Sequence, residues 1–379
     1  MKSFHRFNWK LPLLLYLATW LTTTFCQIKF GNETLYSFLL SLCLSVASAE
    51  SASQHWCVFG QHLWNAFLFS TALMFILTCH ELGHHLQSRR YRLRSSLPLF
   101  LPMPFGPLGT LGAVIVMDDE VPHSRALFDI GISGPLAGLL PTLIFLYYGV
   151  QWSYLGPHQS NELEFADPLL FQWVTHWTFG PVPPDMVLHK HPVAFAAWAG
   201  LLLTTLNLMP FSQLDGGHVF YALLGRRSIP IVHCIFAATI IAVAWFQLWH
   251  WSLLLILIAL IGISHPPTAN DTVPLKPFRH CLGWATLLFV FIGFAPTPLN
   301  PNGYEPNNKP VWYCLKENVL RKFPETLAGT RHAVVPAETG IQRTESLGEH
   351  FPKRGGMCSG QTSAIFLTKP FYRLKTSHF

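Results

Sequence analysis

Residues 67–85 read FLFSTALMFILTCHELGHH, an apolar run that ends in a group of ionisable side chains. Positions 80–84 within it have the pattern H-E-x-x-H. Residues i and i+4 lie on one face of a helix, so His80 and His84 can bind one Zn²⁺ while Glu81 reaches a water on the metal. Ionisable residues at the end of a membrane run are costly and indicate a functional site. The stretch therefore predicts a zinc site on a membrane helix; the competing interpretation is an interfacial cluster at a helix end.

The composition favours a membrane protein over a soluble globule. Half of the 379 residues are hydrophobic and 12% are charged, which is too few charges to cover a soluble chain of this length. The pattern predicts an all-α multi-pass membrane protein with about 6–7 transmembrane helices. Apolar stretches long enough to cross or nearly cross a hydrocarbon core occur at 11–26, 63–87, 126–149, 192–209, 229–247, 251–264 and 281–295.

A third metal ligand is expected elsewhere in the chain, because catalytic zinc usually takes three protein ligands and leaves a fourth position for water. The candidate is Asp215, in the segment NLMPFSQLDGGH (207–218) that follows an apolar run. Pro210 interrupts a helix, and the glycines after Asp215 permit a tight non-helical backbone. Irregular backbone at membrane depth is tolerated only inside the protein or along a cavity. The alternative is a polar turn at the membrane surface, since D-G-G is a common turn sequence.

Residues 104–116, PFGPLGTLGAVIV, are apolar yet broken by glycine and proline. They are too interrupted for a helix and too apolar for an ordinary loop. The pattern predicts a small re-entrant β-like hairpin whose strand edge can hold an unfolded substrate strand by main-chain hydrogen bonds. Structural filler is the alternative interpretation.

The segment SRALFDIGISGPLAG (124–138) opens another apolar run. Gly134 and Gly138 lie four residues apart, a spacing that lets a neighbouring helix approach closely. We therefore expect this segment to serve packing. Asp129 within it has no role that the sequence suggests.

The placement of basic residues predicts an orientation in the membrane. If the N-terminus is inside and residues 35–49 lie at the interface without crossing, the basic clusters at 89–94, 226–227 and 276–279 all face the cytoplasm. Most of the net charge of +6 lies after residue 300, so it does not indicate a nucleic-acid partner.

Three regions are expected along the chain. Residues 1–62 would form an N-terminal anchor helix and the interfacial segment, with a cleaved signal peptide as the alternative for the anchor. Residues 63–298 would form the core that holds the metal site. Residues 299–379 lose the apolar runs and are predicted to be poorly ordered.

Five separated motifs occur along the chain in the order HELGHH, GTLGAVI, RALFDIGISGPLAG, NLMPFSQLDGGH and HPPTANDTVPLKPFR. Together they resemble the site-2 protease family of intramembrane metalloproteases. The resemblance covers about residues 60–298. It implies that His80, His84 and Asp215 bind one zinc ion per chain, that Glu81 is the general base and that Asn207 helps polarise the scissile carbonyl. It also implies a helical core whose site is reached from the cytoplasmic side.

The expected function is zinc-dependent cleavage of membrane-spanning protein segments, with the lipid bilayer as surroundings. Two alternatives compete with it: a membrane metal transporter or sensor, and an inactive protease-like scaffold. A transporter has no need of a glutamate between the two histidines, which argues against the first. All the residue types that catalysis needs are present, which argues against the second. The oligomeric state is left open by the sequence.

Overall fold

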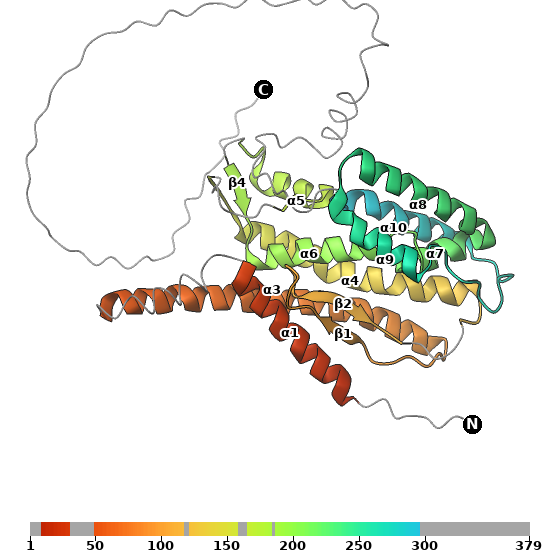
Figure 1. The fold of residues 1–379 in the computed structure, drawn as a ribbon, viewed down its shortest axis with the longest axis horizontal. Coiled ribbons are helices and arrows are strands. Elements are labelled where there is room, and N and C mark those ends of the chain that lie inside the picture. Colours follow the sequence, from red (N-terminus) through yellow and green to blue (C-terminus); the bar gives the residue numbers. More distant parts are fainter. Residues whose placement is uncertain (1–8, 31–48, 117–120, 158–164, 184–185, 296–379) are drawn as a thin grey trace, which may run out of the picture. The chain divides into compact units, whose positions relative to one another are not determined.

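The computed structural model describes residues 9–30, 49–116, 121–157, 165–183 and 186–295, and this part of the chain is mostly helical (Figure 1). The helices include α1 (Lys10–Phe30), α3 (Ala49–Arg90), α4 (Ser124–Trp152), α5 (Leu169–Phe179), α6 (Pro192–Asn207), α7 (Asp215–Leu224), α8 (Ser228–Trp245), α9 (Ser252–Ile261) and α10 (Pro277–Gly293).

The apolar character of the helices confirms an integral membrane protein, at the level of length and composition. Four helical segments of the described chain are long and apolar enough to cross a bilayer: Lys10–Ile28, Phe59–Arg90, Ser124–Trp152 and Asp215–Trp245. Helices α6, α9 and α10 are apolar but shorter, so the count of six or seven crossings remains a prediction.

Helix α4 lies at the centre of the bundle and packs against α3, α6 and α7 (Figure 1). One apolar cluster joins α3 to α6 and includes the fully buried Leu73 and Trp198. A second joins α4 and α7 to the later helices and includes Phe128 and Tyr221. Helix α4 therefore contacts both halves of the core, and the elements that carry the predicted metal ligands pack on it.

Local sequence explains where the two central helices begin. The N-cap of α4 is His123, whose side chain accepts a hydrogen bond from the backbone N–H of Ala126 at 3.0 Å. Helix α6 starts at Pro192, a residue favoured in the first helical turn because it has no N–H to leave unsatisfied. Its N-cap His191 accepts from the N–H of Val193.

The expected β-hairpin is present, but it begins earlier than residue 104. Strands β1 (Leu99–Pro102) and β2 (Thr110–Val114) pair antiparallel, with Leu99 opposite Val114. Helix α1 lies against the hairpin, and Thr22 donates a hydrogen bond from its hydroxyl to the carbonyl of Gly109 at 2.8 Å. Gly109 has φ +73° and its Cα faces the α1 backbone, so only glycine fits this contact.

The region 150–191, between the apolar runs 126–149 and 192–209, contains further short elements. Strands β3 (Tyr154–Pro157) and β4 (Met186–His189) pair antiparallel, and α5 lies between them in sequence. Phe171 of α5 is fully buried in the core cluster, so α5 packs on the core of the bundle. Residues 35–48 of the predicted interfacial segment 35–49, and the whole predicted tail 299–379, lie outside the described residues.

Candidate metal centre

Helix α3 places the two histidines of the H-E-x-x-H pattern on one face. His80 and His84 are one turn apart, and their ring centroids lie 4.9 Å from each other. His80 is 4% exposed, and Glu81 beside it is 6% exposed. Burial of three ionisable side chains on an apolar helix is costly, so the site needs a compensating partner.

Asp215 supplies that partner from the other side of the bundle. It is the first residue of α7 and follows an irregular segment after α6, in which Ser212 has φ +52°. A Cβ at Gly216 or Gly217 would collide with backbone carbonyls of this segment, so the two glycines allow the chain to fold back tightly. The expected interruption between α6 and α7 therefore brings the Asp215 carboxylate to the histidines.

The three donor groups converge within hydrogen-bonding distance of one another. The Nε2 atom of His80 lies 3.0 Å from Oδ2 of Asp215 and 3.1 Å from Nε2 of His84. The Nε2 atom of His84 lies 3.2 Å from Oδ1 of Asp215. A ring nitrogen has either one proton or one lone pair, so it can make only one such hydrogen bond. Nε2 of His80 is close to both Asp215 and His84, and hydrogen bonds alone therefore do not account for the cluster.

A zinc ion fits this donor set. All three ligand atoms lie within 4.8 Å of one another. Tetrahedral zinc with ligand bonds of roughly 2.0–2.2 Å requires donors about 3.3–3.6 Å apart, close to the separations found here. Two imidazoles and one carboxylate are also a common protein set for catalytic zinc, with the fourth position left for water.

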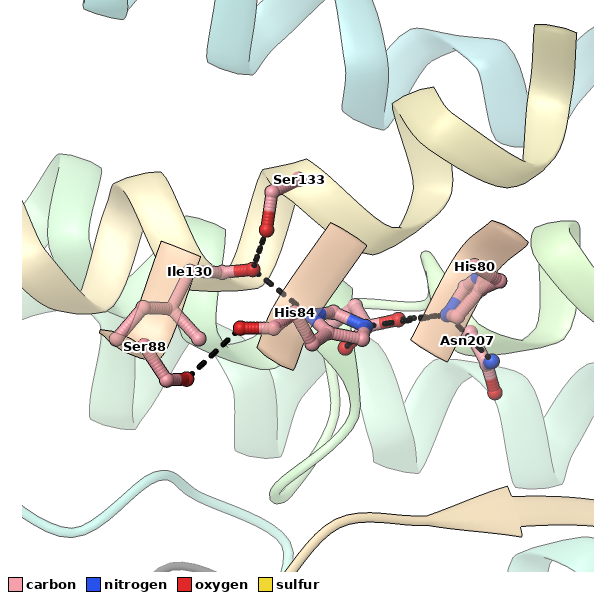
Figure 2. Close-up of polar contacts among 7 residues, drawn as sticks. His80, His84, Ser88, Ile130, Ser133 and Asn207 are labelled. Atoms are coloured by element: carbon pink, nitrogen blue, oxygen red, sulfur yellow. Dashed lines mark hydrogen bonds and ion pairs between the residues drawn. The ribbon is translucent and has the colours of Figure 1, made fainter. Parts of the chain in front are cut away.

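Helix α4 packs against α3 at the two histidines and orients one of them. The Nδ1–H of His84 donates to the backbone carbonyl of Ile130 at 2.8 Å, which leaves Nε2 facing the site (Figure 2). The hydroxyl of Ser133 donates to the same carbonyl at 2.8 Å. A Cβ at Gly134 would collide with the His84 ring, and one at Gly138 would lie 3.0 Å from the Cβ of His80. The spacing of Gly134 and Gly138 was expected to let a neighbouring helix approach closely. That helix is α3, and the close contact lies at His80 and His84.

Glu81 and Asn207 both line a cavity next to the donor set. Asn207 is the last residue of α6, and its Nδ2 lies 3.5 Å from Nε2 of His80 (Figure 2). The cavity has a volume of about 50 Å³, and strand β2 forms one of its walls. Its lining residues are Ile76, Leu77, His80, Glu81, Leu111, Gly112, Ala113, Gly200, Leu203, Thr204 and Asn207.

Other polar groups near the site had no role assigned from sequence. His218 lies one turn after Asp215 on α7 and is half-buried; its Nδ1 is shielded from solvent and has no hydrogen-bond partner among the described residues. Its ring packs against that of His265 with centroids 4.7 Å apart, and burial lowers the pKa of His265. The i+3 spacing from Asp215 was the available signal for His218. His85 points away to the segment before β1, where its Nδ1 lies 3.0 Å from the hydroxyl of Ser95.

Comparison with known proteins agrees with the motifs. Residues 68–249 match the model of peptidase family M50, the site-2 protease family, so the resemblance is confirmed over this segment. The chain is similar to "Probable zinc metalloprotease EGY1, chloroplastic" of Oryza sativa subsp. japonica, with 30% identity over 40% of this chain and 27% of that protein. The protein of the same name in Arabidopsis thaliana is 30% identical over 41% of this chain and 29% of its own length.

A further relative aligns over a longer segment at lower identity. "Probable zinc metalloprotease EGY2, chloroplastic" of Oryza sativa subsp. indica is 25% identical over 59% of this chain and 41% of its own length. The chain thus spans less than half the length of each of these relatives. The family match ends at residue 249, so the fifth motif and helix α10 lie beyond it.

Proposed function

We propose that this chain, whose residues 68–249 match peptidase family M50, is a zinc-dependent endopeptidase that cleaves membrane-spanning segments of other proteins. The observation that carries the proposal is the convergence of His80, His84 and Asp215 on one point within a bundle of apolar helices. The adjacent cavity adds a buried carboxylate, Glu81, and an amide, Asn207. These are the groups that hydrolysis of a peptide bond needs beside a metal.

Each residue has a distinct task in the proposed mechanism. His80, His84 and Asp215 would hold the ion, which when bound would polarise the peptide carbonyl and lower the pKa of a water ligand towards about 7. Glu81 takes a proton from the attacking water and passes it to the leaving amine. Asn207 donates from its amide N–H to the carbonyl oxygen as negative charge develops there.

The substrate must reach the site in an extended form. A membrane helix hides its carbonyls in hydrogen bonds from residue i to i−4, so attack requires local unwinding. Strand β2 borders the cavity, and an extended substrate segment can pair with it by main-chain hydrogen bonds. We therefore expect helix-weakening residues near the cleavage position to increase turnover.

The orientation in the membrane is part of the same proposal. We place the basic clusters at 89–94, 226–227 and 276–279 on the cytoplasmic side, from which water reaches the site. Helices α6, α9 and α10 would lie within the bilayer and bring the total to six or seven helices. We also retain the division into 1–62, 63–298 and 299–379 as part of the proposal.

Reconstitution into liposomes tests the function. The purified chain should cleave a co-reconstituted single-span substrate that has a glycine or proline in its apolar segment, and a zinc chelator should abolish cleavage. Restored cleavage after zinc is added back is the required control. Zinc flux across the liposome without cleavage would contradict the proposal and support the transporter instead.

A further inference from the structure

A half-buried ionic network ties together three helices beside the metal centre. Asp129 of α4 accepts two hydrogen bonds from Arg279 of α10: Nε to Oδ1 at 2.7 Å and Nη2 to Oδ2 at 2.9 Å. The hydroxyl of Tyr91, the residue after α3, donates to Oδ2 of Asp129 at 2.6 Å. Asp129 is 14% exposed and Arg279 26% exposed. Bidentate arginine–carboxylate pairs are among the stronger and more directional polar contacts in proteins.

Tyr91 is fixed in this network as a hydrogen-bond donor. Burial and the neighbouring Asp129 raise the pKa of Tyr91 to about 12, so its hydroxyl keeps the proton that it donates. Its ring also packs edge-on against His123, the N-cap of α4, with centroids 5.7 Å apart. The end of α3 is thereby attached to the start of α4 at two points.

The network is one residue away from a group that orients a metal ligand. Ile130, which follows Asp129, supplies the carbonyl that accepts from Nδ1 of His84. Gly131 comes next, and its Cα faces His218 and the backbone carbonyl of Asp215. A shift of α4 along α3 would therefore move the Ile130 carbonyl relative to the imidazole that it orients.

We propose that Asp129, Arg279 and Tyr91 are positioning residues for the metal site: they hold α4 in the place where the Ile130 carbonyl orients His84. The inference rests on the proposed metal-binding role of His84. Arg279 lies beyond the segment that matches the family model, so the inference gives α10 a part in the metal centre. None of the three residues belongs to the donor set or lines the adjacent cavity; each acts through Ile130.

Zinc affinity measured by chelator competition tests the proposal in the full chain. Groups that support a metal ligand typically contribute 10–100-fold to metal affinity. Since Arg279 acts one step further out, we expect Arg279→Gln to weaken zinc binding roughly tenfold. Arg279→Lys keeps the charge but loses the two-pronged geometry, so it should recover part of the affinity. Asp129→Asn should resemble Arg279→Gln.

A matched control separates this role from simple loss of a surface charge. Arg226 is 80% exposed and its Nε lies 3.9 Å from Asp271, so Arg226→Gln removes a loose ion pair. It should leave zinc affinity unchanged. A second measurement uses the zinc-free protein: amide hydrogen exchange at residues 126–134 should be faster in Arg279→Gln than in wild type or Arg226→Gln.

Zinc binding by the wild-type protein separates failure of this inference from failure of the proposed function. If wild-type protein binds no zinc, the metal site itself is refuted. If wild type binds zinc and Arg279→Gln binds it equally well with a lowered melting temperature, the network is only structural and the inference is overturned. Should Arg279→Gln fail to fold, Tyr91→Phe removes a single hydroxyl; unchanged zinc affinity in both Tyr91→Phe and Arg279→Lys would equally overturn it.

Discussion

At the scale of single residues, the hydrogen bonds that a side chain already makes decide which of its atoms can face the metal site. The Ile130 carbonyl accepts a hydrogen bond from Nδ1–H of His84. The other ring nitrogen, Nε2, then carries the lone pair and faces Asp215. Glu81 is adjacent to His80 on the same helix but lines the cavity. This separation supports the proposed roles, with the histidines as metal ligands and Glu81 as the group that transfers the proton.

The first prediction concerns Glu81→Gln. Glutamine has nearly the same shape but cannot take a proton, so turnover should fall about 10²–10⁴-fold while bound zinc stays at the wild-type level. Cleavage assays and metal analysis on the same preparation measure both quantities. Normal turnover with full zinc content would remove Glu81 from the mechanism.

The second prediction concerns Asp215→Ala, which removes the one ligand that comes from outside α3. Zinc occupancy after dialysis should drop well below that of wild type, because two imidazoles alone bind the ion weakly. Asp167→Ala, in the segment before α5, is the control for loss of a carboxylate. Equal zinc content in the two variants would exclude Asp215 from the ligand set.

At the scale of elements, the candidate metal site depends on the close approach of α3 and α4. Gly134 and Gly138 of α4 face the rings of His84 and His80, and Gly83 of α3 faces the α4 backbone at Ser133. Small residues on both helices let the backbones approach far enough for the Ile130 carbonyl to meet His84. The packing motif and the metal motif therefore form one contact surface.

Gly134→Ala follows from this contact as the third prediction. The added methyl group meets the His84 ring, so the helices must separate or the ring must turn. Overpacking of this kind costs about 1–3 kcal/mol of stability, and zinc affinity should fall with it. Gly60→Ala is a matched control, since a Cβ there meets no heavy atom within 4 Å. Equal zinc affinity in both variants would contradict the role given to the α3–α4 contact.

At the scale of the whole molecule, the helices carry the site between two chemically different ends. The basic cluster at 89–94 lies where α3 ends, close to the start of α4. The other end of α4 is followed by β3 and has exposed aromatic residues such as Trp152 and Tyr154. Cationic residues favour the cytoplasmic side, and tryptophan and tyrosine favour the membrane interface. The two ends of α4 should therefore face opposite sides of the bilayer.

Thiol labelling from either side of sealed vesicles tests this fourth prediction. In a background with all eight native cysteines replaced by serine, Arg94→Cys should react only from the cytoplasmic side and Tyr154→Cys only from the other. The 29 residues of α4 span about 43 Å, enough to separate these positions across a membrane. Reaction of both from the same side would refute the proposed orientation.

Much of this arrangement was predictable because it is encoded over short distances in the chain. The i, i+4 pair of histidines, the apolar runs, the break before Asp215 and the hairpin near residues 104–116 each follow from the order of a few neighbouring residues. Helix α7 was not predicted as an element, since D-G-G reads as a turn until tertiary packing holds it as the start of a helix.

By itself the sequence determined the candidate metal donors, their spacing on α3 and the apolar character of the helices. Only the tertiary structure decided which groups surround them: the Ile130 carbonyl, 46 residues from His84, and the pairing of Asp129 with Arg279, 150 residues apart. The reason is physical. Helical periodicity is set by local backbone geometry, whereas contacts between distant segments depend on how whole helices pack, which no short stretch of sequence records.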